Sequence, residues 1–262
     1  MALTEPVDAA GLRHRLISVY ARIEAAAAAA RAGRAPGAVK MLLATKTQAA
    51  ATVRLAYDTL LELGMSGPRF GENRSREGRD KAAALDLPGA AWSMIGHVQS
   101  NKADEVLAFA SEVQSLDRMS LAVALERRLQ REGRSIDVLV QVKTAGESSK
   151  FGLAAADVPA FLTEMKALGA LRVRGFMTLA TNAADEGEVR RCFRALRDVQ
   201  KRAVQVGPPD TGMSQLSMGM SGDFELAVEE GSTCVRLGQA VFGRRSFRPP
   251  GGWWAEKAAS GA

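Results

Sequence analysis

The chain has 262 residues, of which 47% are hydrophobic and 24% are charged, and its formal net charge is +6 at pH 7. This length matches one α/β barrel of about 250 residues, although two small domains would also fit it. The composition is that of an ordinary globular protein. Its two cysteines, Cys192 and Cys234, exclude a disulfide framework and lack the spacing of a zinc site.

Neither a membrane nor a nucleic acid is an expected partner. The longest apolar run is the alanine tract Ala25–Ala30. A membrane-spanning helix needs about 20 apolar residues, so this run is far too short. The N-terminal residues MALTEPVDAAG include acidic residues and lack the apolar segment of a signal peptide. The lysines and arginines are scattered, often beside acidic residues, and form no basic run interleaved with aromatics. We therefore expect a cytoplasmic protein.

The chain begins with a predicted helix. Residues from about 5 to 31 are rich in alanine, arginine and leucine, which are strong helix formers. Glycine and proline residues between positions 33 and 37 end this pattern. We therefore expect an extra N-terminal helix, with its lead-in, at 1–38.

From Val39 onward, short apolar runs alternate with helical patterns. The eight predicted strands are Val39–Thr45, Arg69–Gly71, Trp92–Gly96, Glu112–Leu116, Asp137–Val142, Val173–Leu179, Gln215–Gly219 and Cys234–Gly238. Helical patterns lie between them near 50–63, 74–85, 101–109, 118–131, 155–168, 185–206 and 222–230. Such alternation is typical of parallel strands joined by right-handed crossovers.

Eight strand–helix units favour closure into a single (β/α)8 TIM-type barrel, with a doubly wound open sheet as the alternative. No linker divides the chain, so we expect one domain overall, with the barrel at 39–245 and a tail at 246–262. The tail is either a mobile end or packs Trp253 and Trp254 against the barrel.

A lysine follows the first predicted strand directly. Because catalytic groups of such barrels lie at the carboxyl ends of the strands, Lys46 is expected at the barrel mouth. A lysine at a strand end is most often a solvated surface charge. If nearby cations or burial lower its pKa, the neutral amine can instead attack an aldehyde to form a Schiff base.

Small residues gather after the last two strands. Ser217 lies towards the end of the seventh strand pattern, Gly238 ends the eighth, and Gln239 follows it directly. Such residues allow backbone N–H groups to approach a phosphate, and phosphate sites of these barrels often lie there. The alternative is that the glycines only form tight turns between a strand and a helix.

Arg236 lies within the eighth predicted strand. A buried arginine needs an acceptor, because its guanidinium only donates hydrogen bonds and stays charged. A pyridine nitrogen is one possible acceptor, and a carboxylate such as Glu72 or Glu225 is another.

Eight stretches of the sequence, in order, resemble the pyridoxal phosphate homeostasis protein family, whose members are single-domain relatives of the alanine racemase barrel. The matching stretches are LLATKTQ (42–48), RFGENRSRE (69–77), WSMIGHVQSNK (92–102), VQSLDR (113–118), GESSKFGL (146–153), GFMTLA (175–180), LSMGMSGDFELAVEEGST (216–233) and VRLGQAVFGRR (235–245). Each stretch alone is weakly specific, whereas eight in the right order are highly specific.

The resemblance implies a fold like the N-terminal domain of alanine racemase and a site for pyridoxal 5′-phosphate (PLP). It implies that Lys46 carries PLP as an internal aldimine, that Arg236 faces the pyridine nitrogen and that Asn73 lines the site. The positions that it places around the phosphate are Ser217, Gly238 and Gln239.

The sequence departs from the family at three positions. A second lysine that is common near the first is replaced by Gln48, and a threonine near the phosphate is replaced by Gln239. Lys143 lies where an asparagine often follows the fifth strand. A backbone N–H at position 239 would still be available to phosphate.

We expect a protein that holds and buffers PLP for intracellular PLP homeostasis, without turnover of its own. An arginine at the pyridine nitrogen keeps the ring unprotonated, and such a ring is a weak electron sink. Tyr20 and Tyr57 fall in predicted helices, so the best spare base is His97, although a loop histidine of this kind more often makes a structural hydrogen bond.

Two enzyme hypotheses stay open. One is a slow fold-type III PLP-dependent amino-acid racemase, and the other is a barrel enzyme that forms a Schiff base with a sugar phosphate. For the carrier hypothesis, we expect a monomer that passes PLP to PLP-requiring apoenzymes. Lys102 and Lys150 are candidates for transient PLP acceptors, and no metal site is expected.

Overall fold

The structure of the chain is a computed structural model that describes residues 8–30, 35, 37–65, 67–145, 151–181, 185–205 and 212–243. Lys150, Trp253 and Trp254 lie outside the described residues, so the predictions made for the tail and for Lys150 stay predictions.

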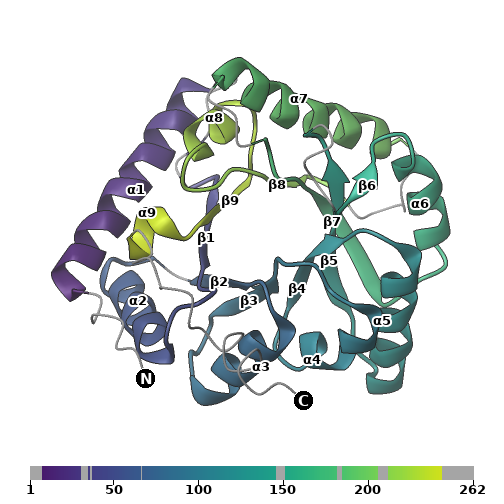
Figure 1. Cartoon of the computed structure of the whole chain (residues 1–262), viewed down its shortest axis with the longest axis horizontal. Helices are drawn as coiled ribbons and strands as arrows, with labels where there is room; N and C mark the ends of the chain where they lie inside the picture. Colours follow the sequence, from purple (N-terminus) through teal and green to yellow (C-terminus); the bar gives the residue numbers. More distant parts are fainter. Residues whose placement is uncertain are drawn as a thin grey trace, which may run out of the picture.

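Eight parallel strands form a closed ring, which confirms the predicted (β/α)8 barrel and excludes the open sheet (Figure 1). The ring closes because β4 pairs with β5. Its strands are β1 (Lys40–Ala44), β2 (Arg69–Glu72), β3 (Ala91–Met94), β4 (Glu112–Leu116), β5 (Ile136–Lys143), β7 (Leu171–Met177), β8 (Gln215–Ser217) and β9 (Cys234–Leu237). A strand that the sequence did not predict, β6 (Leu153–Ala154), pairs only with the end of β5.

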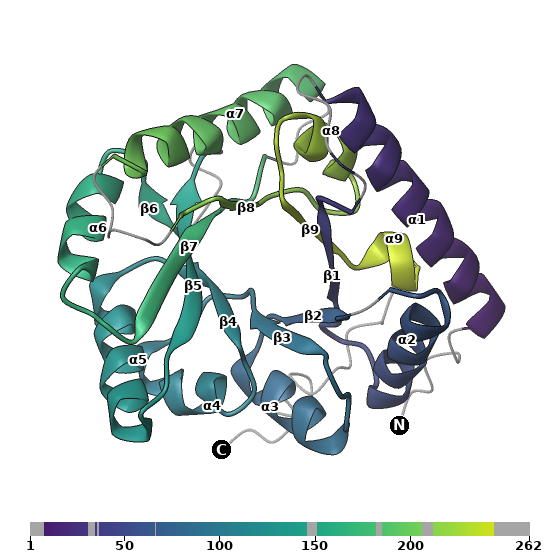
Figure 2. The ribbon, with the colours of Figure 1, turned by 180° about the vertical axis from the view of Figure 1, so that it is seen from behind.

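Helices surround the ring on its outside, as both views of the molecule show (Figures 1 and 2). They are α1 (Ala9–Ala29), α2 (Ala50–Glu62), α3 (Ser75–Ala84), α4 (Ala103–Leu107), α5 (Met119–Glu132), α6 (Val158–Met165), α7 (Glu186–Ala203), α8 (Phe224–Glu229) and α9 (Gln239–Phe242). A short 3-10 turn at Ser100–Lys102 precedes α4, so the single helix predicted at 101–109 is divided.

The predicted N-terminal helix is present as α1, and it covers a gap in the helical layer. The last helix, α9, has only four residues and is too short to cover β9 and β1. Helix α1 lies across this position (Figure 2) and buries an apolar face that includes Leu12 and Leu16 in the same cluster as Leu43 of β1 and Val235 of β9. Arg15 of α1 also donates a 2.7 Å hydrogen bond from Nε to the carbonyl of Val241.

The strands alternate between two faces, as the pleat of a β-strand requires. On β5, Val138, Val140 and Val142 belong to the apolar cluster that includes residues of α5 and α6. The intervening residues, among them Gln141, therefore face the barrel interior. Polar side chains are buried inside, whereas the layer between strands and helices is mostly apolar.

Gly175 of β7 provides a test of the barrel packing. A Cβ atom at this position would lie 1.9 Å from the carbonyl oxygen of Gln215, which belongs to the neighbouring strand β8. We expect Gly175→Ala to lower the unfolding free energy by about 3 kcal/mol, because the two strands must separate. Thermal unfolding should shift downward on the order of 10 °C.

The matched control is Gly169→Ala, because a Cβ atom there meets no atom within 4 Å. This variant should unfold within a degree or two of the wild type. Equal stability of the two variants would contradict the close approach of β7 and β8.

Candidate functional site

A cavity of about 870 Å³ opens at the carboxyl ends of the strands, as the barrel architecture predicts. Its walls come from residues at or after the ends of β1, β2, β3, β7, β8 and β9. Five of the six predicted site residues line it, and they are Lys46, Asn73, Arg236, Gly238 and Gln239.

Lys46 lies in a tight turn immediately after β1. The N–H of Gln48 donates a 2.9 Å hydrogen bond to the carbonyl of Thr45, which closes the turn. Thr47 has a φ of 67°, a backbone conformation that residues other than glycine rarely adopt. A strained backbone conformation persists only where surrounding contacts hold it, so the turn around Lys46 must be held by its neighbours.

A buried ion-pair cluster holds the turn from behind. Lys81 of α3 has a side chain that is 9% exposed, and its Nζ donates 2.7 Å to the carbonyl of Thr45. The same ammonium donates to Oε1 of Glu72 at 2.8 Å and to Oε1 of Glu77 at 2.7 Å. Glu77 also accepts the N–H of Thr47 at 2.7 Å. The residues on both sides of Lys46 are therefore fixed by one charged cluster.

Glu72 is the most buried member of this cluster. Its side chain is 0% exposed, and Oε1 accepts a 2.7 Å hydrogen bond from the hydroxyl of Thr45. Burial raises the pKa of Glu72, although the charge of Lys81 acts in the opposite direction. The cluster thus contains a carboxylate that depends on its cation. Sequence patterns do not reveal this cluster, because Lys81 is one of several charged residues in a polar helix.

Asn73 follows β2 and contributes an acceptor to the cavity. Within the described part of the chain, its Oδ1 is buried and has no hydrogen-bond partner. Buried polar atoms are rarely left in this condition, so the atom favours a ligand with a donor group. Gly96 allows this arrangement, since a Cβ atom there would lie 2.2 Å from the carbonyl oxygen of Asn73.

Arg236 lies in β9 and is 4% exposed. Its NH1 donates to Oγ of Ser217 and its NH2 to the carbonyl of Thr178, both at 2.7 Å. The predicted alternative, a pair with Glu72 or Glu225, is wrong. Glu72 bonds to Lys81, and Glu225 accepts a 2.6 Å hydrogen bond from Nε of Arg22.

Small residues form one end of the cavity, as predicted. Gly238 and Gln239 lie there together with Ser221 and Gly222, which follow β8. Ser221 accepts a 3.0 Å hydrogen bond at Oγ from the N–H of Ala240, so the two segments are joined. Sequence reasoning did not select Ser221, although its place after a strand, next to Gly222, was a usable signal.

Ser217 is the predicted site residue that the structure places elsewhere. It does not line the cavity, and its side chain is 0% exposed inside the barrel. Its hydroxyl accepts from Arg236 and donates to Oε1 of Gln114 at 2.7 Å. A contact between this hydroxyl and a phosphate would require these bonds to break.

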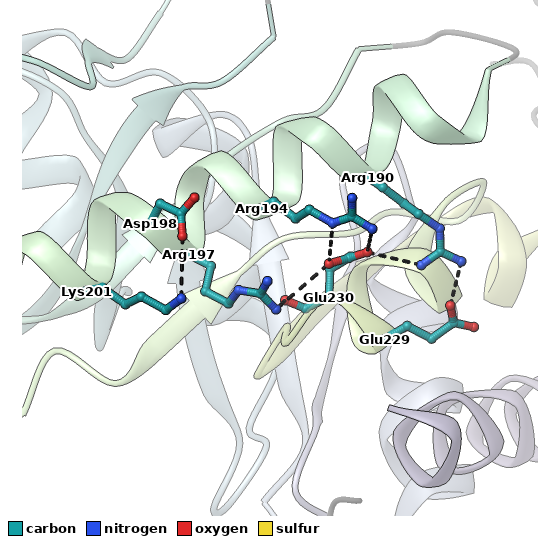
Figure 3. Close-up of polar contacts among 7 residues, drawn as sticks. All are labelled: Arg190, Arg194, Arg197, Asp198, Lys201, Glu229 and Glu230. Carbon is teal, nitrogen blue, oxygen red and sulfur yellow. Dashed lines mark hydrogen bonds and ion pairs between the residues drawn. The ribbon is translucent and has the colours of Figure 1, made fainter. Parts of the chain in front are cut away.

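Helices α7 and α8 form an outer wall, and charged residues bind them together (Figure 3). Glu230 accepts hydrogen bonds at 2.8 Å from Arg194 and at 3.3 Å from Arg190, and its carbonyl accepts from Arg197 at 3.2 Å. Because Val189 of α7 and Leu226 of α8 both line the cavity, this network fixes part of the cavity wall.

The spare base considered from the sequence, His97, does not line the cavity. Its Nδ1 lies 3.4 Å from Oδ2 of Asp117, and its ring stacks on Phe151 with 3.9 Å between the ring centroids. These contacts favour the structural explanation of His97. In the described ranges, no group of three His, Cys, Asp or Glu side chains is arranged to hold a metal ion.

Comparisons with known proteins agree with this geometry. The family model "Alanine racemase, N-terminal domain" matches residues 20–246. A pyridoxal phosphate homeostasis protein of Pseudomonas aeruginosa is 37% identical over 240 residues, which cover 91% of this chain and 98% of that protein. The chain belongs to the pyridoxal phosphate homeostasis protein family.

Two solved structures of similar proteins extend the match to three dimensions. A protein from Bifidobacterium adolescentis, described only as an unknown protein, is 34% identical, with a TM-score of 0.79 over 91% of this chain and 98% of that chain. PipY of Synechococcus elongatus, solved with PLP bound, is 32% identical, with a TM-score of 0.72 over 88% of this chain and 100% of that chain. As for membrane association, none of the helices described here has both the length and the apolar character that a bilayer crossing needs.

The cluster behind Lys46 leads to a prediction about stability. Lys81→Met leaves the carboxylate of Glu72 buried beside Glu77 without a cation, so we expect the unfolding free energy to fall by about 3–5 kcal/mol. Urea unfolding of the protein without added PLP measures this loss.

Lys201→Met is the matched control, because Lys201 has a side chain that is 66% exposed and pairs with Asp198 on the surface of α7. Its loss should stay below about 1 kcal/mol. If Lys81→Met is no more destabilising than Lys201→Met, the cluster does not hold the turn.

Proposed function

We propose that this chain binds PLP through a covalent bond to Lys46 and acts in PLP homeostasis by holding and buffering the cofactor. The observation that carries the proposal is the convergence of Lys46, Asn73 and Arg236 on one cavity whose end is built from small residues. Relatives at 33–37% identity are named pyridoxal phosphate homeostasis protein, and the similar PipY was solved with PLP.

The groups around the cavity fit the cofactor. PLP has an aldehyde that a neutral lysine amine can attack, and Lys46 lines the cavity. The buried Oδ1 of Asn73 offers an acceptor to the hydroxyl group of the ring. Backbone N–H groups near Gly222 and Gly238 can approach a phosphate because these residues lack side chains.

Arg236 gives this site a chemical character of its own. Two of its nitrogens are bonded to Ser217 and Thr178, and among the described residues no acceptor bonds to its Nε. Since the guanidinium only donates, it can donate to the pyridine nitrogen but cannot protonate it. A ring that stays unprotonated is a poor electron sink, which suits retention of PLP better than turnover.

Among the described residues, three carboxyl groups line the cavity, those of Glu186, Asp223 and Glu225, and the last two are already engaged in hydrogen bonds. Asp223 accepts a 2.6 Å hydrogen bond from the N–H of Met220, and Glu225 is bonded to Arg22. Burial raises the pKa of Asp223. Among the described cavity residues there is neither a tyrosine nor a histidine. The racemase alternative therefore has less support than the carrier.

Labelling at Lys46 tests the central claim. Wild-type protein saturated with PLP and reduced with borohydride should carry the pyridoxyl phosphate group on the peptide that contains Lys46. Lys46→Ala should lose this label and should release PLP on gel filtration, because only non-covalent contacts remain. Peptide mass mapping measures the label.

Lys102→Ala is the control, because Lys102 follows β3 at the mouth side and pairs with Glu105 at 2.8 Å without lining the cavity. It should keep the label on Lys46. An unmodified Lys46 in PLP-saturated wild type would overturn the proposal, and label on Lys102 would support its predicted role as a transient acceptor.

The carrier and the slow racemase differ in the fate of the substrate α-hydrogen. We expect the PLP-loaded protein in deuterated water to exchange the α-hydrogen of alanine no faster than an equal concentration of free PLP. Proton NMR of the amino acid measures the exchange. Exchange that is much faster, and that is lost in Lys46→Ala, would favour the racemase.

We further propose that the protein works as a cytoplasmic monomer that passes PLP to apoenzymes. The monomer is tested by light scattering, where a mass of twice 27.8 kDa would contradict it. Transfer is tested by mixing the loaded protein with a PLP-requiring apoenzyme, which should regain activity faster than free PLP at the same concentration restores it.

A further inference from the structure

A chain of buried polar side chains crosses the barrel interior and ends at Arg236. In this side-chain network, the hydroxyl of Ser217 on β8 donates a 2.7 Å hydrogen bond to Oε1 of Gln114 on β4. From Nε2 of Gln114 the network continues to Oε2 of Glu112 at 2.7 Å. Strands β8 and β4 are not neighbours, so the contact between Ser217 and Gln114 spans the interior.

The residues at the two ends of this side-chain network, Arg236 and Glu112, fix the direction of every hydrogen bond in it. The guanidinium of Arg236 can only donate, so Oγ of Ser217 must accept and its proton must be directed to Gln114. The amide of Gln114 then presents its NH2 group to Glu112, whose carboxylate only accepts. Ser93 of β3 donates to the same carboxylate oxygen at 2.8 Å.

Water does not compete with these bonds, because the residues of the side-chain network are almost completely buried. Ser93 and Ser217 are 0% exposed, Gln114 is 1% exposed and Glu112 is 6% exposed. Hydrogen bonds in such an environment polarise one another, so a change at one end affects the other end.

Arg236 needs this support, since it is a buried cation whose two bonded acceptors, Ser217 and the carbonyl of Thr178, are both neutral. Burial lowers the pKa of Arg236, and the carboxylate of Asp223 only partly offsets this. The side-chain network directs the hydroxyl oxygen of Ser217 toward the guanidinium of Arg236. Through Gln114 it also connects Ser217 to the negative charge of Glu112.

We propose that Gln114 and Glu112 are positioning residues that act through Ser217 on Arg236 and so set the hydrogen bond between Arg236 and the ring nitrogen of bound PLP. This inference rests on the proposed function, because it takes the ring nitrogen to lie at Arg236. It also gives Ser217 a role inside the barrel in place of the predicted contact with phosphate.

The test uses PLP labelled with 15N at its ring nitrogen, bound to the full-length protein. Gln114→Met removes both hydrogen bonds of the amide at nearly constant volume. We expect the 15N signal of the bound ring to move away from its wild-type position and PLP binding to weaken about tenfold. The phosphorus signal of the bound phosphate should stay unchanged, because the side-chain network does not reach the small-residue end of the cavity.

Gln141→Met is the matched control. Gln141 is a second buried glutamine, 4% exposed, on the inward face of β5. Its Nε2 donates to the carbonyl of Phe151 and not to a residue of the side-chain network. Its variant should keep the wild-type 15N signal and affinity. The inference is overturned if Gln114→Met behaves as the wild type does, or if both variants shift the signal equally.

Glu112→Gln decides the question if Gln114→Met does not fold, since it keeps the shape of the side chain and removes the charge. It should shift the 15N signal in the same direction, and a wild-type signal would overturn the inference. Borohydride labelling of Lys46 in the wild type separates the two claims. Absence of that label defeats the proposed function, whereas a labelled wild type with unresponsive variants defeats only the role of Gln114 and Glu112.

Discussion

Pairing between β4 and β5 joins the two ends of a row of parallel strands, and the site depends on this closure. Because all strands of the ring run the same way, their carboxyl ends form a single rim. Residues as far apart in the sequence as Ala44 and Gly243 therefore line one cavity. The ring also divides each strand into an inward face and an outward face, and each face supports the cavity differently.

The outward face supports Lys46 with charge, whereas the inward face supports Arg236 with an oriented set of dipoles. Lys81 and its two glutamates lie behind β1 and hold the strained turn at Thr47. Ser217 and Gln114 lie inside the ring. Both supports exclude water, so the loss of one partner exposes another to an unfavourable environment. The contacts on the two faces thus hold the residues on either side of Lys46 and the guanidinium of Arg236 in their places at the cavity.

The barrel and most of the cavity could be predicted from the sequence because they depend on local patterns. Apolar runs mark the strands, and in a parallel ring the residue after each strand must lie at the rim, which placed Lys46, Asn73 and Gly238 correctly. Ser217 is different, since it is the last residue of a three-residue strand and its inward direction depends on how β8 pairs with β7. Lys81 was missed because burial of a helical lysine depends on a carboxylate that another element supplies.

The position of α1 has a consequence for how the molecule is made. The first described helix covers β1 and β9 and packs against α8 and α9, so its apolar residues Leu12, Leu16 and Val19 meet partners that are synthesised about 200 residues later. Until then, a nascent chain emerging from the ribosome exposes this face to solvent. Such exposure favours aggregation and the binding of chaperones. The outer layer beside β1 is therefore complete only after the residues of β9, with which β1 pairs, have been synthesised.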